Sequence, residues 1–125
     1  MARYDKYEPY AGGFRALLNA DWLEADLNKA VGVGLNTSGL VVKGAGNTGV
    51  RGVLVLTKIR KAGAVVDVMT DGEITEFGGT AGTNYFAAAA DGVINATSAA
   101  GKTFVGQTVE GGRLIVRVAG SVVPA

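Results

Sequence analysis

Residues 103–118 read TFVGQTVEGGRLIVRV, and this stretch decides the fold. Thr103–Val109 and Leu114–Val118 are rich in β-branched and apolar residues, which favour extended strands. Glu110-Gly111-Gly112 lies between them and has the composition of a short turn joining antiparallel strands. The stretch therefore predicts a β-hairpin.

Similar short runs occur upstream of this hairpin, from Val31 onward. Extended segments are expected at 40–43, 50–60, 64–70, 73–77 and 93–97. The predicted turns between them are Lys61-Ala62-Gly63 and the type I′ turn Asp71-Gly72, while 85–90 fits a short helix or a strand equally well. Strands that recur every eight to twelve residues or so predict a mainly β fold, a small antiparallel β-barrel or sandwich.

The first part of the chain differs from this β region in being rich in aromatic residues. Pro9 and the Gly12-Gly13 pair argue against a continuous helix here, so residues 1–19 are predicted to form an extended N-terminal arm. The side chains expected to bind a partner are aromatic: Tyr4, Tyr7, Tyr10 and Phe14 of the arm, and Trp22 just beyond it. The alternative is that the arm folds back onto the core of its own domain.

One short helix is expected after the arm. Asp21 is a candidate N-cap, and Glu24 three residues later would complete a capping box. Residues 20–125 are then predicted to form a single β-rich domain, since a chain of 125 residues leaves little room for a second core.

Composition limits the possible partners. Apolar residues make up 48% of the chain and charged residues 18%, which is typical of a folded domain. The net charge is +1 and the basic residues are dispersed, so no nucleic-acid partner is expected. No apolar run approaches the roughly 20 residues of a membrane-spanning helix, and the first residues lack the apolar stretch of a signal peptide, so no membrane partner is expected.

Catalytic chemistry has few candidate residues. The chain contains no His and no Cys, which excludes His-dependent triads and thiolate or imidazole zinc sites. Gly44–Gly49 matches a dinucleotide-binding pattern, but β-branched residues follow it where a helix is required, so a turn is predicted. The acidic clusters Asp71/Glu73/Glu76 and Asp21/Glu24/Asp26 are interpreted as solvated charges and capping groups. We therefore expect no enzyme activity, no cofactor and no metal.

Three bases lie close together beside a predicted hairpin, namely Lys58, Arg60 and Lys61. They could contact an acidic partner surface, or they could protect a sheet edge from unwanted pairing. The two sequons, which begin at Asn36 and Asn95, are interpreted as turn residues.

Three stretches resemble the small head-decoration, or capsid-cement, proteins of tailed bacteriophages: residues 34–44 (GLNTSGLVVKG), 48–54 (TGVRGVL) and 105–118 (VGQTVEGGRLIVRV). The resemblance implies a β-barrel-like domain on the outer surface of an icosahedral phage head, made in the host cytoplasm. It also implies a homotrimer that binds the major capsid protein and holds neighbouring subunits together, with the Tyr-rich arm laid across them. It provides no catalytic residue.

Two other functions stay open from the sequence. The chain could be another virion component, such as a head fibre or tail-tube protein. It could also be a small ligand-binding or carbohydrate-binding β module, although the β region supplies few aromatic residues for a sugar platform: Phe77, Tyr85, Phe86 and Phe104.

Overall fold

The computed structural model describes residues 12–124, and these form an antiparallel β structure with one turn of 3-10 helix. The helical turn η2 spans Glu24–Asp26. The strands are β1 (Gly12–Leu17), β2 (Val31–Leu35), β3 (Val41–Lys43), β4 (Gly52–Leu54), β5 (Val65–Thr75), β6 (Asn84–Ala87), β7 (Ile94–Asn95), β8 (Thr103–Thr108) and β9 (Arg113–Arg117). The predicted mainly β, antiparallel fold is confirmed.

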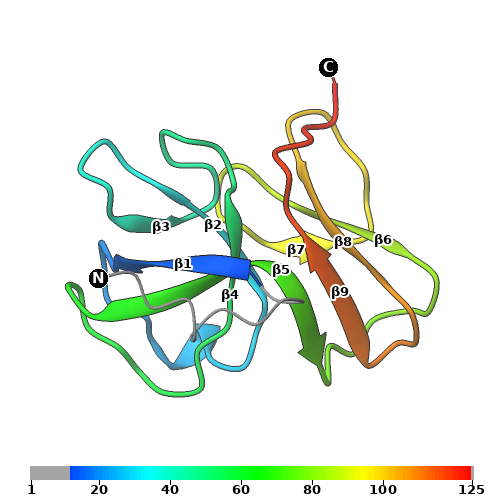
Figure 1. Ribbon diagram of the computed structural model, residues 1–125, viewed down its shortest axis with the longest axis horizontal. Helices are drawn as coiled ribbons and strands as arrows, with labels where there is room; N and C mark the ends of the chain where they lie inside the picture. The colour runs from blue at the N-terminus through cyan, green and yellow to red at the C-terminus, as the bar shows by residue number, and fades with distance from the viewer. Residues whose placement is uncertain (1–11, 125) are drawn as a thin grey trace.

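The strands form one sheet in the order β3-β2-β4-β5-β9-β8-β6-β7, with β1 paired to β5 beside this path. Figure 1 shows the sheet folded into two lobes: β1–β4 lie in the first, β6–β9 lie in the second, and β5 runs from one to the other. An antiparallel bridge between Val31 of β2 and Val93, the residue before β7, links the two lobes a second time. Long β5 therefore fixes how the lobes are placed.

Each lobe has its own apolar cluster. The first gathers side chains from β2–β5 and from the residues after β1: Leu18, Trp22, Val31, Val33, Val41, Leu54, Val66 and Val68. The second gathers side chains chiefly from β4, β6, β8 and β9: Val50, Val53, Tyr85, Ala87, Val105, Leu114 and Val116. In β5, Val66 and Val68 are buried while Val65 and Asp67 are exposed, so the alternation of a half-buried strand selects the face that meets the core.

The predicted turn at Asp71-Gly72 is wrong. Both residues lie within β5, where Asp71 is paired with Arg117 and Gly72 with Val116 of β9. Gly72 has a φ of 157°, at the edge of the range that residues with a side chain rarely adopt, and glycine allows the strand to continue through it. The physical reason is that β5 exchanges neighbours here, since β1 pairs with it up to Asp71 and β9 pairs with it from Asp71 onward.

The long strand expected at 50–60 is also wrong in extent. Only β4, Gly52–Leu54, belongs to the sheet, and its ladder pairing with β5 is the single pair Val53–Met69. Residues 55–63 leave the sheet as a connection that runs along the lower left of the molecule in Figure 1. Tertiary pairing with residues 18–22 replaces strand pairing along this connection.

The predicted arm needs a correction as well. Its described part, residues 12–19, belongs to the sheet domain, because β1 pairs with β5 from Gly12–Asp71 to Leu17–Val65. The remainder, residues 1–11, lies outside the described residues. The capping box is absent, since Leu23 occupies the N-cap of η2 and the side chain of Asp21 instead accepts a hydrogen bond from Ala62 N–H.

Several local predictions are confirmed. The hairpin at 103–118 forms as β8 and β9, and Arg113 N–H donates to Glu110 O at 3.1 Å to close its turn. Gly44–Gly49 forms turns without a following helix. Asn36 and Asn95 act as turn residues, because the Oδ1 atom of each accepts a backbone N–H two residues on. Of the region 85–90, for which the sequence leaves a helix and a strand equally open, residues 85–87 belong to strand β6 and 88–90 do not. Within residues 12–124, no helix has the length and apolar character needed to cross a membrane.

Candidate functional site

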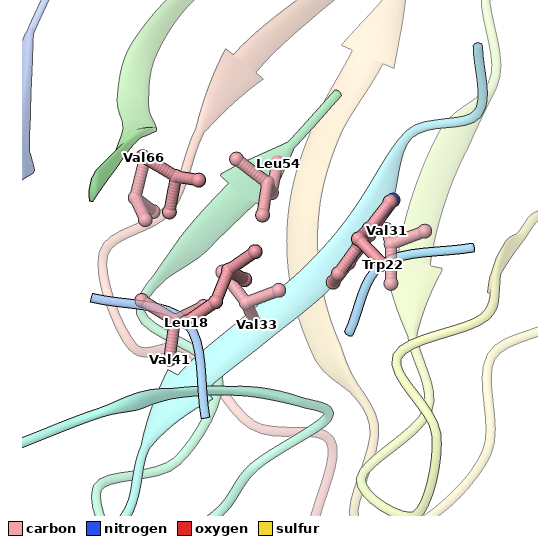
Figure 2. Packing of buried hydrophobic residues seen from close by; sticks show 8 residues of the cluster. Leu18, Trp22, Val31, Val33, Val41, Leu54 and Val66 are labelled. Atoms are coloured by element: carbon pink, nitrogen blue, oxygen red, sulfur yellow. The ribbon is translucent and has the colours of Figure 1, made fainter. Parts of the chain in front are cut away.

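The aromatic residues predicted to bind a partner lie in different parts of the chain and differ in burial. Tyr4, Tyr7 and Tyr10 lie outside the described residues. Phe14 is on the inward face of β1, partly buried against the first-lobe cluster. Trp22 is 2% exposed within that cluster, so its ring is part of the core of this chain and not of its exposed surface. Figure 2 shows Trp22 next to Val31 among the other apolar side chains of the cluster.

Trp22 is buried because its polar and apolar parts both find partners in the first lobe. Its indole Nε1–H donates to the backbone oxygen of Asp26 at 3.2 Å. The ammonium of Lys43 lies 5.1 Å from the ring centroid and also pairs with the Asp26 carboxylate. With its N–H hydrogen-bonded, a cation near its ring and apolar neighbours around it, Trp22 has a structural role in the first lobe.

The bases predicted at the β4–β5 connection do form an exposed surface. We call Lys58, Ile59, Arg60 and Lys61 the basic ridge; all four are exposed, and Ile59 is 55% exposed. Lys58 and Arg60 do not lie together on a strand, because of these four residues only Arg60 makes a bridge, with Trp22. The ridge is therefore a loop surface, and the sheet-edge interpretation does not apply to it.

The backbone of the ridge is held in place by the chain that follows β1. Trp22 and Arg60 exchange two backbone hydrogen bonds, of 2.7 and 3.2 Å. Ala62 N–H donates to Asp21 Oδ1 at 2.8 Å, and Gly63 N–H donates to Leu18 O at 2.8 Å. The segments 18–22 and 60–64 thus form a ribbon that fixes the ridge, with exposed Leu23 beside it.

A second surface feature lies between the lobes. A cavity of about 720 Å³ adjoins one of about 480 Å³, and we call the pair the interlobe groove. The two cavities share five lining residues: Asn28, Val55, Ile74, Thr75 and Glu76. Sequence analysis missed this groove, because its walls come from segments far apart in the chain.

The walls of the groove contain unusual backbone. Asn28 and Glu76 have φ angles of 59° and 55°, and they are the non-glycine residues of the described chain with positive φ. Asn tolerates this conformation, whereas Glu rarely adopts it. Backbone hydrogen bonds at or next to these two residues hold their conformations. Asn28 N–H donates to Leu56 O at 2.8 Å, and Phe77 N–H, next to Glu76, donates to Gly112 O at 3.0 Å. Such conformations persist only where the surroundings impose them.

The smaller cavity of the groove is acidic. Three carboxylates line it and no base does: Asp67, Glu73 and Glu76. Asp67 is bonded to Arg15 at 2.6 Å, and Glu73 to Arg113 at 3.0 Å. Glu76 makes no ion pair with any residue that the structure describes. It therefore adds a negative charge to this end of the groove.

Metal binding by residues 12–124 would depend on how their carboxylates are arranged. No group of three or more acidic side chains in the described part of the chain is placed to hold a metal ion. Glu110 is exposed, and its hydrogen bond to Arg113 holds the pKa of that carboxyl below its ordinary value, as expected of a surface ion pair. The same contacts raise the pKa of the Arg113 guanidinium. These shifts come from solvated surface contacts.

The aromatic residues of the β region pair with one another. Phe77 and Tyr85 lie 4.8 Å apart with ring planes at 88°, and Phe86 and Phe104 lie 5.9 Å apart at 70°. Edge-to-face pairs of this kind stabilise a fold, and their rings do not form one coplanar surface. Tyr85 is also 7% exposed, and its hydroxyl accepts a hydrogen bond from Thr80 N–H. The arrangement is unlike the flat platform that a carbohydrate module presents.

Comparison with known proteins gives a structural likeness. No protein-family model matches the chain, and no curated protein matches it. A solved structure of a chain from Mycobacterium phage Patience is similar, with a TM-score of 0.83 over 96% of this chain and 97% of that one, at 22% sequence identity. The likeness spans both lobes, so the two chains share one fold.

Proposed function

We propose that this chain is a structural protein of a tailed-phage virion, a head decoration protein. It binds the outer surface of the icosahedral head and stabilises the contacts between major capsid subunits. The observation that carries the proposal is the likeness to the Mycobacterium phage Patience chain over 96% of the length. The sequence stretches that resemble decoration proteins support it, and they contain β3, β4 and β9 together with parts of β2 and β8 of this fold.

The described surfaces suit binding better than turnover. The exposed charges are mostly solvated or paired on the surface, and the described residues supply no catalytic constellation that we recognise. In this proposal the protein is not an enzyme and needs no cofactor. It acts as a homo-oligomer, a trimer, whose many weak contacts on one particle add through multivalency.

The segment before β1 is proposed to contact the shell. It contains Tyr4, Tyr7 and Tyr10, and β1 begins immediately after it, at Gly12. Tyr combines a large apolar area with a hydrogen-bonding tip, which suits contact surfaces. Since Phe14 and Trp22 belong to the core, the three tyrosines are the aromatic residues left for this role.

Co-sedimentation with phage heads that lack the chain tests the proposal. The full chain is expected to sediment with the heads, whereas a chain that starts at Gly12 is expected to keep its melting temperature and stay in the supernatant. Tyr4→Ser/Tyr7→Ser/Tyr10→Ser should behave like the truncation, and Asp5→Asn/Lys6→Gln, the matched control in the same segment, should bind like the wild type.

Each failure has a distinct meaning. A full chain that never sediments with heads would refute the decoration role. A truncated chain that sediments as well as the full chain would leave decoration standing and refute the role of the tyrosines.

A further inference from the structure

The basic ridge and the smaller cavity of the interlobe groove carry charges of opposite sign, whereas the larger cavity is lined by both acids and bases, Lys29 and Lys43 among them. The ridge presents three bases, and none of them pairs with a carboxylate in the described part of the chain. The smaller cavity of the groove is lined by three carboxylates and no base. Opposite potentials on two exposed surfaces favour their association and orient it.

The apolar parts of the two surfaces match as well. Ile59 stands in the middle of the ridge and is 55% exposed, and Leu23 beside it is also 55% exposed. The apolar lining of the smaller cavity includes Val55, Met69 and Ile74. An exposed aliphatic side chain flanked by bases thus fits an apolar lining flanked by carboxylates.

We propose that the basic ridge of one copy of this chain binds in the interlobe groove of a second copy. Ile59 lies on the apolar lining at Val55 and Ile74, and Lys58 and Arg60 face Glu76. Within the groove Asp67 and Glu73 already have partners in Arg15 and Arg113, so Glu76 is the carboxylate that the second copy's bases neutralise.

Both surfaces are organised before they meet. The ridge is held by the Trp22–Arg60 and Asp21–Ala62 hydrogen bonds, and the groove wall by the imposed backbone at Asn28 and Glu76. Surfaces that are already ordered lose little conformational entropy on binding, which leaves more of the contact energy for affinity.

Ridge and groove consist of different residues, and they adjoin on one copy, since Thr57 of the smaller cavity directly precedes Lys58. A contact between two different surfaces closes into a ring when the rotation between copies allows it. The inference concerns which surfaces join the copies, and it does not depend on attachment to a phage head.

Sedimentation velocity of the purified full chain over a range of concentrations tests the contact. The wild type is expected to self-associate, and raising the salt concentration should weaken the association because it screens the charges. Glu76→Lys and Lys58→Glu/Arg60→Glu should each weaken it by about tenfold or more, since each places like charges opposite one another. Arg51→Glu reverses an exposed charge outside both surfaces and should change little.

Combining the two charge-reversed variants provides the decisive test of the contact. A 1:1 mixture of the Glu76→Lys and Lys58→Glu/Arg60→Glu variants keeps one intact ridge and one intact groove, so it should form dimers. A chain that carries all three substitutions should regain self-association, because the charges are swapped across the contact. Melting temperatures close to that of the wild type show that the variants are folded.

The proposal is overturned if the wild type stays monomeric at every concentration. It is equally overturned if both sets of variants associate like the wild type, or if the mixture gives no dimer. None of these results affects co-sedimentation of the chain with heads, so failure here is distinguishable from failure of the decoration role.

Discussion

The variant Trp22→Ala tests whether the Trp22 side chain stabilises the fold or binds a partner. The side chain is 2% exposed in the first-lobe cluster, and the substitution removes the whole indole from contact with Val31 and its neighbours. Truncating a buried aromatic residue to Ala typically destabilises a protein by about 3–5 kcal/mol, from lost transfer energy and the cavity left behind. The loss of the Nε1–H bond to Asp26 O is included in that range.

This loss is large for a chain of 125 residues. Domains are typically stable by about 5–15 kcal/mol, so the variant gives up a substantial part of the total. At about 4 °C per kcal/mol for a domain of this size, the melting temperature should fall by about 12–20 °C. Differential scanning calorimetry, with urea titration as a second measure, gives both quantities.

Leu23→Ala is the matched control. Leu23 is the next residue in the chain but is 55% exposed, and surface substitutions usually change stability by no more than about 0.5 kcal/mol. If Trp22→Ala melted within about 4 °C of the wild type and instead lost binding to heads, the indole would belong to a partner surface and the placement of Trp22 in the core would be refuted.

Two further predictions concern backbone and charge. Gly92→Ala should lower the free energy of unfolding by several kcal/mol in urea titration, because a Cβ there would lie 2.0 Å from Gly32 O at a φ of +73°. Gly39→Ala is the control: its φ is +77° but no atom lies within 4 Å of the added Cβ, so it should lose only about 1–2 kcal/mol. Equal losses in the two variants would contradict the close approach at Gly92. Because Arg113 lowers the folded-state pKa of Glu110 below its ordinary 4.5, this pair stabilises the fold above that pH, and its contribution is lost as the pH falls through the lowered pKa. In Arg113→Ala the Glu110 carboxyl should titrate at higher pH by NMR, and an unchanged midpoint would contradict the hydrogen bond as its cause.

The parts of the fold that the sequence predicts well are those fixed by local pattern. The β8–β9 hairpin follows from β-branched runs around a Gly-Gly turn. The turn at Gly44–Gly49 follows from the absence of a helix signal after it. In both cases the information lies within a few neighbouring residues.

The predictions that fail are those that tertiary pairing overrides. Asp71-Gly72 has the composition of a tight turn, yet β1 and β9 pair with β5 on either side of it and keep the strand extended. Residues 55–60 alternate like a strand, yet they leave the sheet to pair with the chain around Trp22. Local composition does not reveal which distant segment will compete for the backbone.

The candidate surfaces divide in the same way. The exposed bases Lys58, Arg60 and Lys61 could be named from the sequence, because charge seldom lies buried. The groove could not be predicted from the sequence. Nothing in the sequence around Glu76 indicates a positive φ, and Asn28, which lines the groove with it, lies far away in the chain. The aromatic residues that precede Trp22 in the sequence indicate a partner-binding surface, whereas its ring packs inside the first-lobe cluster.

An image reconstruction of the phage particle that carries this chain tests the decoration role most directly. The role predicts density for the two-lobed β fold on the outside of the head, over junctions between major capsid subunits, with additional density leading from the start of β1 onto the shell. Density for this fold in the tail tube, inside the shell, or nowhere on the particle would contradict it.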